Sequence, residues 1–137
     1  MSPTQFDTFY WPGLKKVAEA MTDMGMVYVP LYEADWTSRL EHLLEFPKGK
    51  TIARFALTDL VKAKEILGGH TCIMGGVPHS ILQTASPQQI EEHCKNLIET
   101  VGKGGGFILS TNTGITNDAK PENVKAMVDA VKKYGVY

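Results

Sequence analysis

The chain has 137 residues, of which 43% are hydrophobic and 21% charged, and this is the composition of a single globular domain with a sizeable core. Its net charge of -1 gives no basic field for nucleic acid, and no apolar run approaches the roughly 20 residues that cross a bilayer. We therefore expect a cytoplasmic protein without nucleic-acid or membrane partners, whose two cysteines are reduced.

Helical and strand-like segments alternate along the chain. A leading helix is expected over 4–24, broken or kinked at Pro12. Four short apolar runs, largely β-branched or aromatic, then predict buried strands, and a helical pattern follows each run. The strands are expected at 26–32, 51–55, 71–74 and 106–110, and the helices after them at 37–45, 58–67, 86–102 and 121–135. This alternation predicts a parallel sheet covered by helices.

Start signals and apolar spacing indicate how the helices are built. Ser86, Pro87 and Gln89 have the pattern of a capping box with proline at the first helical position. One apolar face of each helix is expected to be buried. The expected inward residues are Leu40, Leu43 and Leu44 at 37–45, Ile90, Cys94, Leu97, Ile98 and Val101 at 86–102, and Val124, Met127, Val128 and Val131 at 121–135.

Two architectures fit four strand–helix units in one domain of residues 1–137. One is an open doubly wound sheet, and the other is a segment of a (β/α)8 barrel. Periodicity does not distinguish them, but a full barrel needs roughly 200 residues or more, so this chain forms at most half of one. In both architectures the loops that follow the strands meet at the carboxyl edge of the sheet, where chemistry is expected.

Candidate catalytic side chains follow the first and third strands. Glu33 and Asp35 come directly after the first strand, and two carboxylates held close together can act as acid and base or bind a hard cation. The alternative is that Asp35 or Thr37 only caps the following helix. His79 follows the third strand and is a candidate general base, the alternative being an exposed loop residue.

Other residues of these loops are candidates for substrate binding. Trp36 would form an apolar wall beside Asp35, and Asn112 and Thr113 would donate or accept hydrogen bonds. The segment His70–Cys72 has the spacing of a zinc half-site, but it lies at the amino end of its strand and no second Cys/His pair is near in sequence. We therefore expect no metal site.

Most of the chain resembles a known superfamily. The segments that carry the resemblance are TQFDTFYWPGLKKV, EADWTSRLEHL, FPKGKTIARF, TDLVKAKEILGGHTCIMGGVP, SPQQIEEHCKNLI and GGGFILSTNTGITNDAKPENVKAMVDAV. They resemble the carboxyl-terminal half of the uroporphyrinogen decarboxylase superfamily, which includes porphyrinogen decarboxylases and cobalamin-dependent methyltransferases. The resemblance implies an α/β fold, the (βα)4 half of a TIM (β/α)8 barrel with parallel strands and a leading helix.

The resemblance also implies a function for this half. It would be the substrate-binding part of a corrinoid-linked methyltransferase or a decarboxylase-like enzyme, with a small-molecule or tetrapyrrole-like substrate and a corrinoid protein as a candidate partner. The thiolate-rich zinc site of the methyltransferases is absent, and Thr113 stands where the decarboxylases have a substrate-binding histidine. We therefore expect the isolated chain to be inactive, and no cofactor is indicated.

A non-enzymatic function is an alternative hypothesis. Half of a barrel leaves two sheet edges and an apolar inner face uncovered, and such surfaces favour association. The alternative is thus a truncated fragment that is stable only through self-association. In either case we expect a homo-oligomer, because two four-stranded halves together have the eight strands of a complete barrel.

Overall fold

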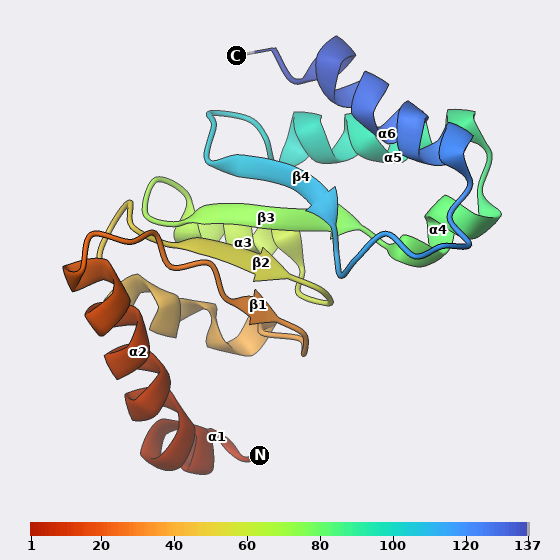
Figure 1. Cartoon of the computed structure of the whole chain (residues 1–137). Coiled ribbons are helices and arrows are strands. Elements are labelled where there is room, and N and C mark those ends of the chain that lie inside the picture. Colours follow the sequence, from red (N-terminus) through yellow and green to blue (C-terminus); the bar gives the residue numbers. More distant parts are fainter. Residues whose placement is uncertain (137) are drawn as a thin grey trace.

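The computed structural model describes residues 1–136 and contains a four-stranded parallel sheet in the order β1-β2-β3-β4 (Figure 1). Its strands are β1 Leu31–Tyr32, β2 Ile52–Phe55, β3 Cys72–Val77 and β4 Phe107–Thr111. Every neighbouring pair is parallel. The spatial order follows the chain, as in consecutive strands of a barrel, whereas a doubly wound sheet reverses its order part-way. The predicted parallel sheet is confirmed.

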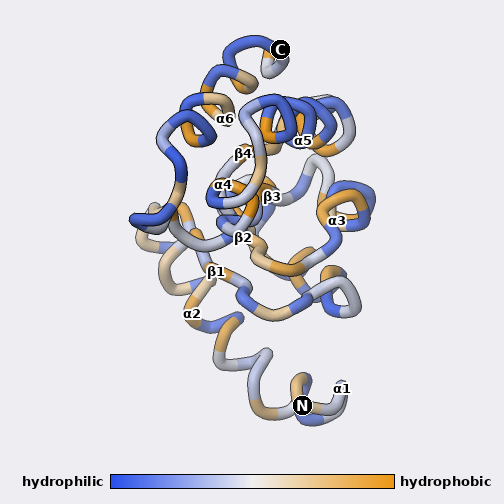
Figure 2. The backbone as a smooth tube through the Cα atoms, turned by 90° about the vertical axis from the view of Figure 1, so that its right-hand side faces the viewer, coloured by the Kyte–Doolittle hydropathy of each residue, from blue (hydrophilic) through white to orange (hydrophobic). Residues whose placement is uncertain are grey.

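Figure 2 shows α3 and α5 together on one side of this sheet, with α6 near its β4 end and α2 near its β1 end. The leading helix consists of α1 Pro3–Gln5, the π-helical segment η1 Phe6–Tyr10 and α2 Trp11–Asp23. The others are the 3-10 helix η2 Thr37–Glu45, α3 Leu60–Leu67, α4 His79–Thr84, α5 Pro87–Thr100 and α6 Pro121–Tyr134. Among the described residues no helix is long and apolar enough to span a bilayer.

The Ser86 capping box is confirmed, and Pro12 changes the leading helix without breaking it. The Ser86 side chain accepts from the N–H of Gln89, whose own side chain accepts from the N–H of Ser86. Before Pro12, the N–H of Trp11 donates to the carbonyl of Phe6, five residues back, which forms a wide turn. Pro12 then occupies the first turn of α2, where a missing N–H costs little.

The first strand is shorter than predicted. Strand geometry is limited to Leu31–Tyr32, with one isolated bridge between Tyr28 and Thr51. Pro30 accepts from the N–H of Arg54 but has no N–H to donate in return, so the ladder loses a bond at this residue. The prediction of a strand over all of 26–32 was therefore wrong in extent.

The helix after β1 has a different period from the one predicted. It is a 3-10 helix, in which residues three apart share a face. Leu40, Leu43 and Phe46 are accordingly buried, whereas Leu44 is 41% exposed. The prediction that Leu44 faces the core was wrong, because it assumed 3.6 residues per turn.

The last helix packs mainly on α5 rather than over the middle of the sheet. Asn123 and Ala130 are buried, and the Asn123 amide donates to the carbonyls of Leu82 and Ala85. Val128 and Val131 are 44% and 39% exposed, so the prediction that they are buried was wrong. The short helix α4 was not predicted, because six residues give too little periodicity to recognise.

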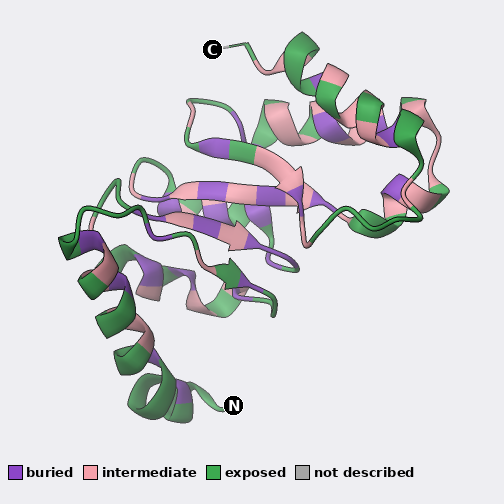
Figure 3. Ribbon diagram, in the orientation of Figure 1, coloured by how far each residue is buried: buried purple, intermediate pink, exposed green. Residues whose placement is uncertain are grey.

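The two faces of the sheet differ in what covers them (Figure 3). Along β2 and β3, buried residues such as Ala53, Phe55 and Ile73 alternate with half-buried ones. The buried set packs in the core with residues of the helices. The alternate set faces away from the helices, and the register aligns one residue from each strand there: Leu31, Arg54, Met74 and Ile108. We call this side the open face.

Candidate functional site

The turn after β1 separates the residues that were predicted to act together. Trp36 is buried and packs on Tyr32, with ring centroids 4.2 Å apart, and its backbone N–H donates to the Thr58 hydroxyl. The indole thus belongs to the helix-side core. Glu33 is exposed, and no hydrogen bond or ion pair is seen for it among the described residues. Glu33 therefore remains a free carboxylate at the carboxyl edge.

Asp35 holds the start of η2. One carboxylate oxygen accepts from the N–H and the hydroxyl of Thr37, at 2.8 Å and 2.5 Å. These hydrogen bonds, first of all the one from the hydroxyl, lower the pKa of Asp35 below its ordinary value. Asp35 thus forms a turn just before η2, whose N-cap is Trp36 and has no side-chain hydrogen bond, and the second carboxylate oxygen of Asp35 is left for a ligand.

Asn112 joins three strands at the carboxyl edge. Its Oδ1 accepts from the N–H of Gly76 at 2.9 Å, and its Nδ2 donates to the carbonyl of Ala56. Gly76 has φ +100°, and a Cβ there would lie 2.8 Å from a methyl group of Leu97. Only glycine fits this close approach of helix to strand. His93 Nε2, from α5, lies 2.8 Å from the Gly76 carbonyl oxygen and so contacts the next peptide group of the same residue.

His79, the first residue of α4, and Thr113, in the loop after β4, meet at the same edge. His79 Nδ1 and Thr113 Oγ1 are 3.4 Å apart, and Gln83 Nε2 donates to the Thr116 hydroxyl at 3.1 Å. A hydrogen bond from Thr116, and to a smaller extent the nearby His79, lowers the pKa of Asp118. An imidazole, a carboxylate and hydroxyl groups therefore converge above β3 and β4.

Arg54 is a candidate residue that sequence reasoning missed. From the open face its Nη2 donates to the Thr111 carbonyl at 3.4 Å, and the same oxygen accepts from the Ser110 hydroxyl. Arg54 Nε is buried without a partner, and none of the ion pairs among the described residues involves Arg54. The feature of the sequence that could have identified Arg54 is that it is a charged residue within the apolar strand predicted at 51–55.

The described part of the chain contains no cluster of three or more His, Cys, Asp or Glu side chains that could hold a metal ion. His70 Nδ1 is 3.0 Å from the Thr71 hydroxyl. Burial raises the pKa of the Cys72 thiol, which disfavours the thiolate that zinc requires.

Comparison with known proteins identifies the family. The sequence profile described as Uroporphyrinogen decarboxylase (URO-D) matches residues 1–134. The chain belongs to the uroporphyrinogen decarboxylase family. A uroporphyrinogen decarboxylase of Methylococcus capsulatus is 28% identical over 126 residues, which are 92% of this chain and 29% of that protein. One from Pseudoalteromonas atlantica is 36% identical over 76 residues, 56% of this chain and 21% of that protein.

A solved structure shares the fold of this chain. A methyltransferase from Methanosarcina mazei superposes with a TM-score of 0.76 and 23% identity, covering 99% of this chain and 39% of that one. The chain thus spans well under half the length of these two uroporphyrinogen decarboxylases and of the methyltransferase with the same fold.

The two hydrogen bonds of the Asn112 side chain lead to a prediction about stability. Replacing Asn112 by alanine leaves the Gly76 N–H and the Ala56 carbonyl without their partner, so we expect Asn112→Ala to lose about 1–3 kcal/mol. The neighbouring Thr113→Ala is the control and should change stability by less than about 0.5 kcal/mol. Urea unfolding followed by circular dichroism measures both. Equal stability of the two variants would mean that these two hydrogen bonds contribute nothing to the free energy of unfolding.

A second prediction concerns metal. One free carboxylate at Glu33 offers too few ligands for a catalytic zinc site, which takes three from the protein. We expect the purified, dialysed chain to carry no stoichiometric zinc, as measured by elemental analysis. A value near one zinc per chain would contradict this expectation.

Proposed function

We propose that this chain is the carboxyl half of a uroporphyrinogen decarboxylase-type barrel and binds part of an acidic substrate at the carboxyl edge of its sheet. The observation that carries the proposal is Arg54, a guanidinium on the open face whose buried Nε has no partner among the described residues. A buried, unpaired donor of this kind is costly, and an anionic group satisfies it with a charge-assisted hydrogen bond.

The loops above Arg54 supply further groups for the same substrate. His79 and Thr113 lie next to each other and Glu33 is free, so a proton could be held or moved by Glu33 or His79. Thr113, the second oxygen of Asp35 and the remaining N–H of Asn112 would hold polar parts of the ligand. Trp36 acts from the core, by supporting Tyr32 beneath this edge.

The family supports the substrate class that we propose. Relatives are named uroporphyrinogen decarboxylase, and a structural neighbour is a methyltransferase. A tetrapyrrole-related polycarboxylate matches the unpaired Nε donor of Arg54. The alternative substrate within the same proposal is a methyl donor, with a corrinoid protein as partner.

Assays of the isolated chain with uroporphyrinogen, and with methylcobalamin plus a thiol, should show no turnover if this half only binds.

A second candidate function is non-enzymatic. Large apolar side chains are exposed on or beside β1 and on β4, with Val27 at 55%, Val29 at 49% and Ile108 at 40%. Such a surface favours self-association. A chain that associates through this surface but binds no acidic ligand would support a structural role.

Ligand binding tests the proposal directly. We expect the full chain to bind uroporphyrin, a stable porphyrin octacarboxylate, and Arg54→Leu to bind about tenfold or more weakly, as one charge-assisted contact is lost. Arg39→Leu is the matched control, because it removes the same charge from a side chain that stacks on Phe6 in the helix layer. Porphyrin absorbance titration measures both. Equal affinity of the two variants would refute the role of Arg54.

A further inference from the structure

Charged side chains are unevenly divided between the two ends of the sheet. Over the whole sequence, fourteen Lys and Arg residues nearly balance fifteen Asp and Glu residues. The loops that enter β2, β3 and β4 are residues 46–51, 68–71 and 101–106, and we call them together the amino edge. They contain three lysines and one histidine but no Asp or Glu. The amino edge is therefore locally basic although the net charge is -1.

Hydrogen bonds hold the three loops of the amino edge beside one another at one end of the sheet (Figure 1). The N–H of Gly49, before β2, donates to the carbonyl of His70, before β3, at 2.9 Å. From α3, Lys64 Nζ donates to the carbonyl of Gly105, before β4, at 2.5 Å. The strands β2, β3 and β4 are neighbours in that order, and adjacent strands lie about 5 Å apart. The three loops together therefore span about 10 Å.

The lysines of the amino edge have no carboxylate partner. Lys48, Lys50 and Lys103 are exposed, and Lys64 is half-buried. None of the ion pairs in the described part of the chain involves any of these four lysines. An ammonium group has three donors, so Lys64 keeps two N–H groups besides the one on the Gly105 carbonyl.

The nearest carboxylates along the chain do not neutralise this edge. Glu45 lies 2.7 Å from Lys15, and Glu99 lies 3.9 Å from Lys95. Glu65, on α3, is exposed and has no ion pair among the described residues. One unpaired carboxylate therefore stands against four unpaired lysines.

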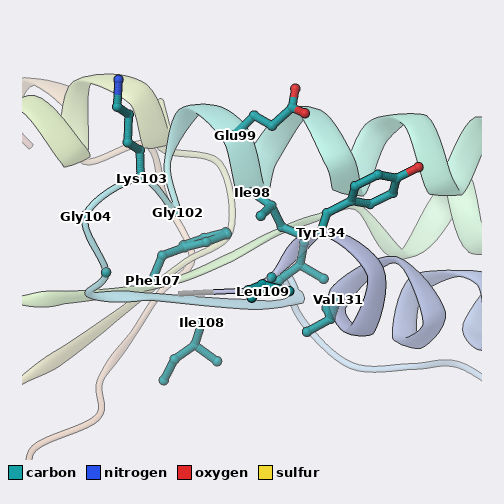
Figure 4. Close-up of a pocket in the computed structure, with 13 residues that line it drawn as sticks. Ile98, Glu99, Gly102, Lys103, Gly104, Phe107, Ile108, Leu109, Val131 and Tyr134 are labelled. Atoms are coloured by element: carbon teal, nitrogen blue, oxygen red, sulfur yellow. The ribbon is translucent and has the colours of Figure 1, made fainter.

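The turn before β4 adds backbone donors to these charges. Gly104, Gly105 and Gly106 have φ +79°, +79° and +69°, and a Cβ on any of them would meet nothing within 4 Å. Among the described residues, no acceptor is found for the N–H groups of Lys103, Gly104 and Gly106. Figure 4 shows the Lys103 side chain extending from this turn away from β4. Successive N–H groups in a turn form a concave surface that binds anions, and glycine lets an anion approach the backbone closely.

These donors favour phosphate over other anions. Arginine, whose planar fork matches a carboxylate in a bidentate manner, does not occur in the three loops. Lysine instead acts on phosphate as a point charge, and backbone N–H groups of glycine-rich turns are common phosphate donors. Because the three loops span about 10 Å, one ligand can contact them with more than one phosphate.

We propose that the amino edge binds the oligophosphate group of a small molecule. The N–H groups of the 103–106 turn hold one phosphate together with Lys64 and Lys103, and Lys48 and Lys50 attract the next. The site is separate from the candidate site at the carboxyl edge, because Glu33 and His79 follow the strands that these loops precede. It can therefore exist whether or not an acidic substrate binds at the carboxyl edge.

Nuclear magnetic resonance titration of the full chain tests the site. The probes are inorganic triphosphate, adenosine triphosphate and inorganic monophosphate, without divalent cations and at a low, constant ionic strength. With triphosphate we expect saturable shifts of the Lys103, Gly104 and Gly106 amide signals, larger than those of the exposed Gly13 and Gly114. Monophosphate should bind about tenfold or more weakly, because it reaches one loop only.

The first two probes distinguish two sources of the same group. Equal affinity for triphosphate and adenosine triphosphate would assign the site to a free oligophosphate, and tighter binding of adenosine triphosphate would assign it to a nucleotide. Both results support the proposal. Equal affinity for monophosphate and triphosphate would contradict it.

A pair of variants locates the contact. Lys103→Gln removes one exposed charge and should weaken triphosphate binding about threefold or more. Lys16→Gln is the matched control, because Lys16 is also exposed and without an ion pair among the described residues but lies on α2, and it should leave the affinity unchanged. Equal effects of the two variants would overturn the proposal. So would the absence of saturable shifts at the three amides, or the same shifts with sodium chloride at equal ionic strength.

Discussion

The structure depends on helices covering only one face of a parallel sheet. Parallel strands need crossover connections, and here each crossover returns on the same side, so the buried residues of β2 and β3 all face the helix layer. The alternate residues are then directed to the open face. Arg54 is placed on that face by strand periodicity alone, since Ala53 and Phe55 on either side of it are buried in the core.

The carboxyl edge is fixed by a small set of backbone contacts. Asn112 binds the backbone at Gly76 and Ala56, and His93 contacts the Gly76 carbonyl from α5. The peptide at Gly76 can approach Leu97 closely because it has no side chain. This arrangement sets where β3 ends and α4 begins, and it therefore positions His79 beside Thr113. Asn112 and His93 therefore fix the backbone that carries the candidate ligand-binding side chains.

Local signals in the sequence predicted much of the fold, and long-range packing decided the rest. The Ser86 capping box and the four strands were predictable because propensity and spacing act within a few residues. Leu44 was placed wrongly because apolar spacing alone does not distinguish a 3-10 helix from an α-helix. Val128 and Val131 were placed wrongly because α6 packs mainly on α5 rather than over the sheet, and apolar spacing does not say which element a helix packs against.

The candidate site was predicted less completely than the fold. The loops were correctly expected at one edge, but the core position of Trp36 depends on its contact with Tyr32, which no spacing encodes. Arg54 was missed because its importance appears only when Thr111, from a strand two places away in the sheet, is beside it. Sequence periodicity predicts which residues of one helix or strand share a face. Which residues of distant elements contact one another is decided by how those elements pack.

Thiol reactivity most directly tests the claim that one face of the sheet is open. Cys72 lies half-buried on the open face, beside Ile52 in the register, whereas Cys94 is completely buried under the helices and burial raises the pKa of its thiol to about 11. In the native chain a small neutral thiol reagent should label Cys72 and leave Cys94 unmodified until the protein unfolds. Equal protection of both thiols, or faster labelling of Cys94, would contradict the account.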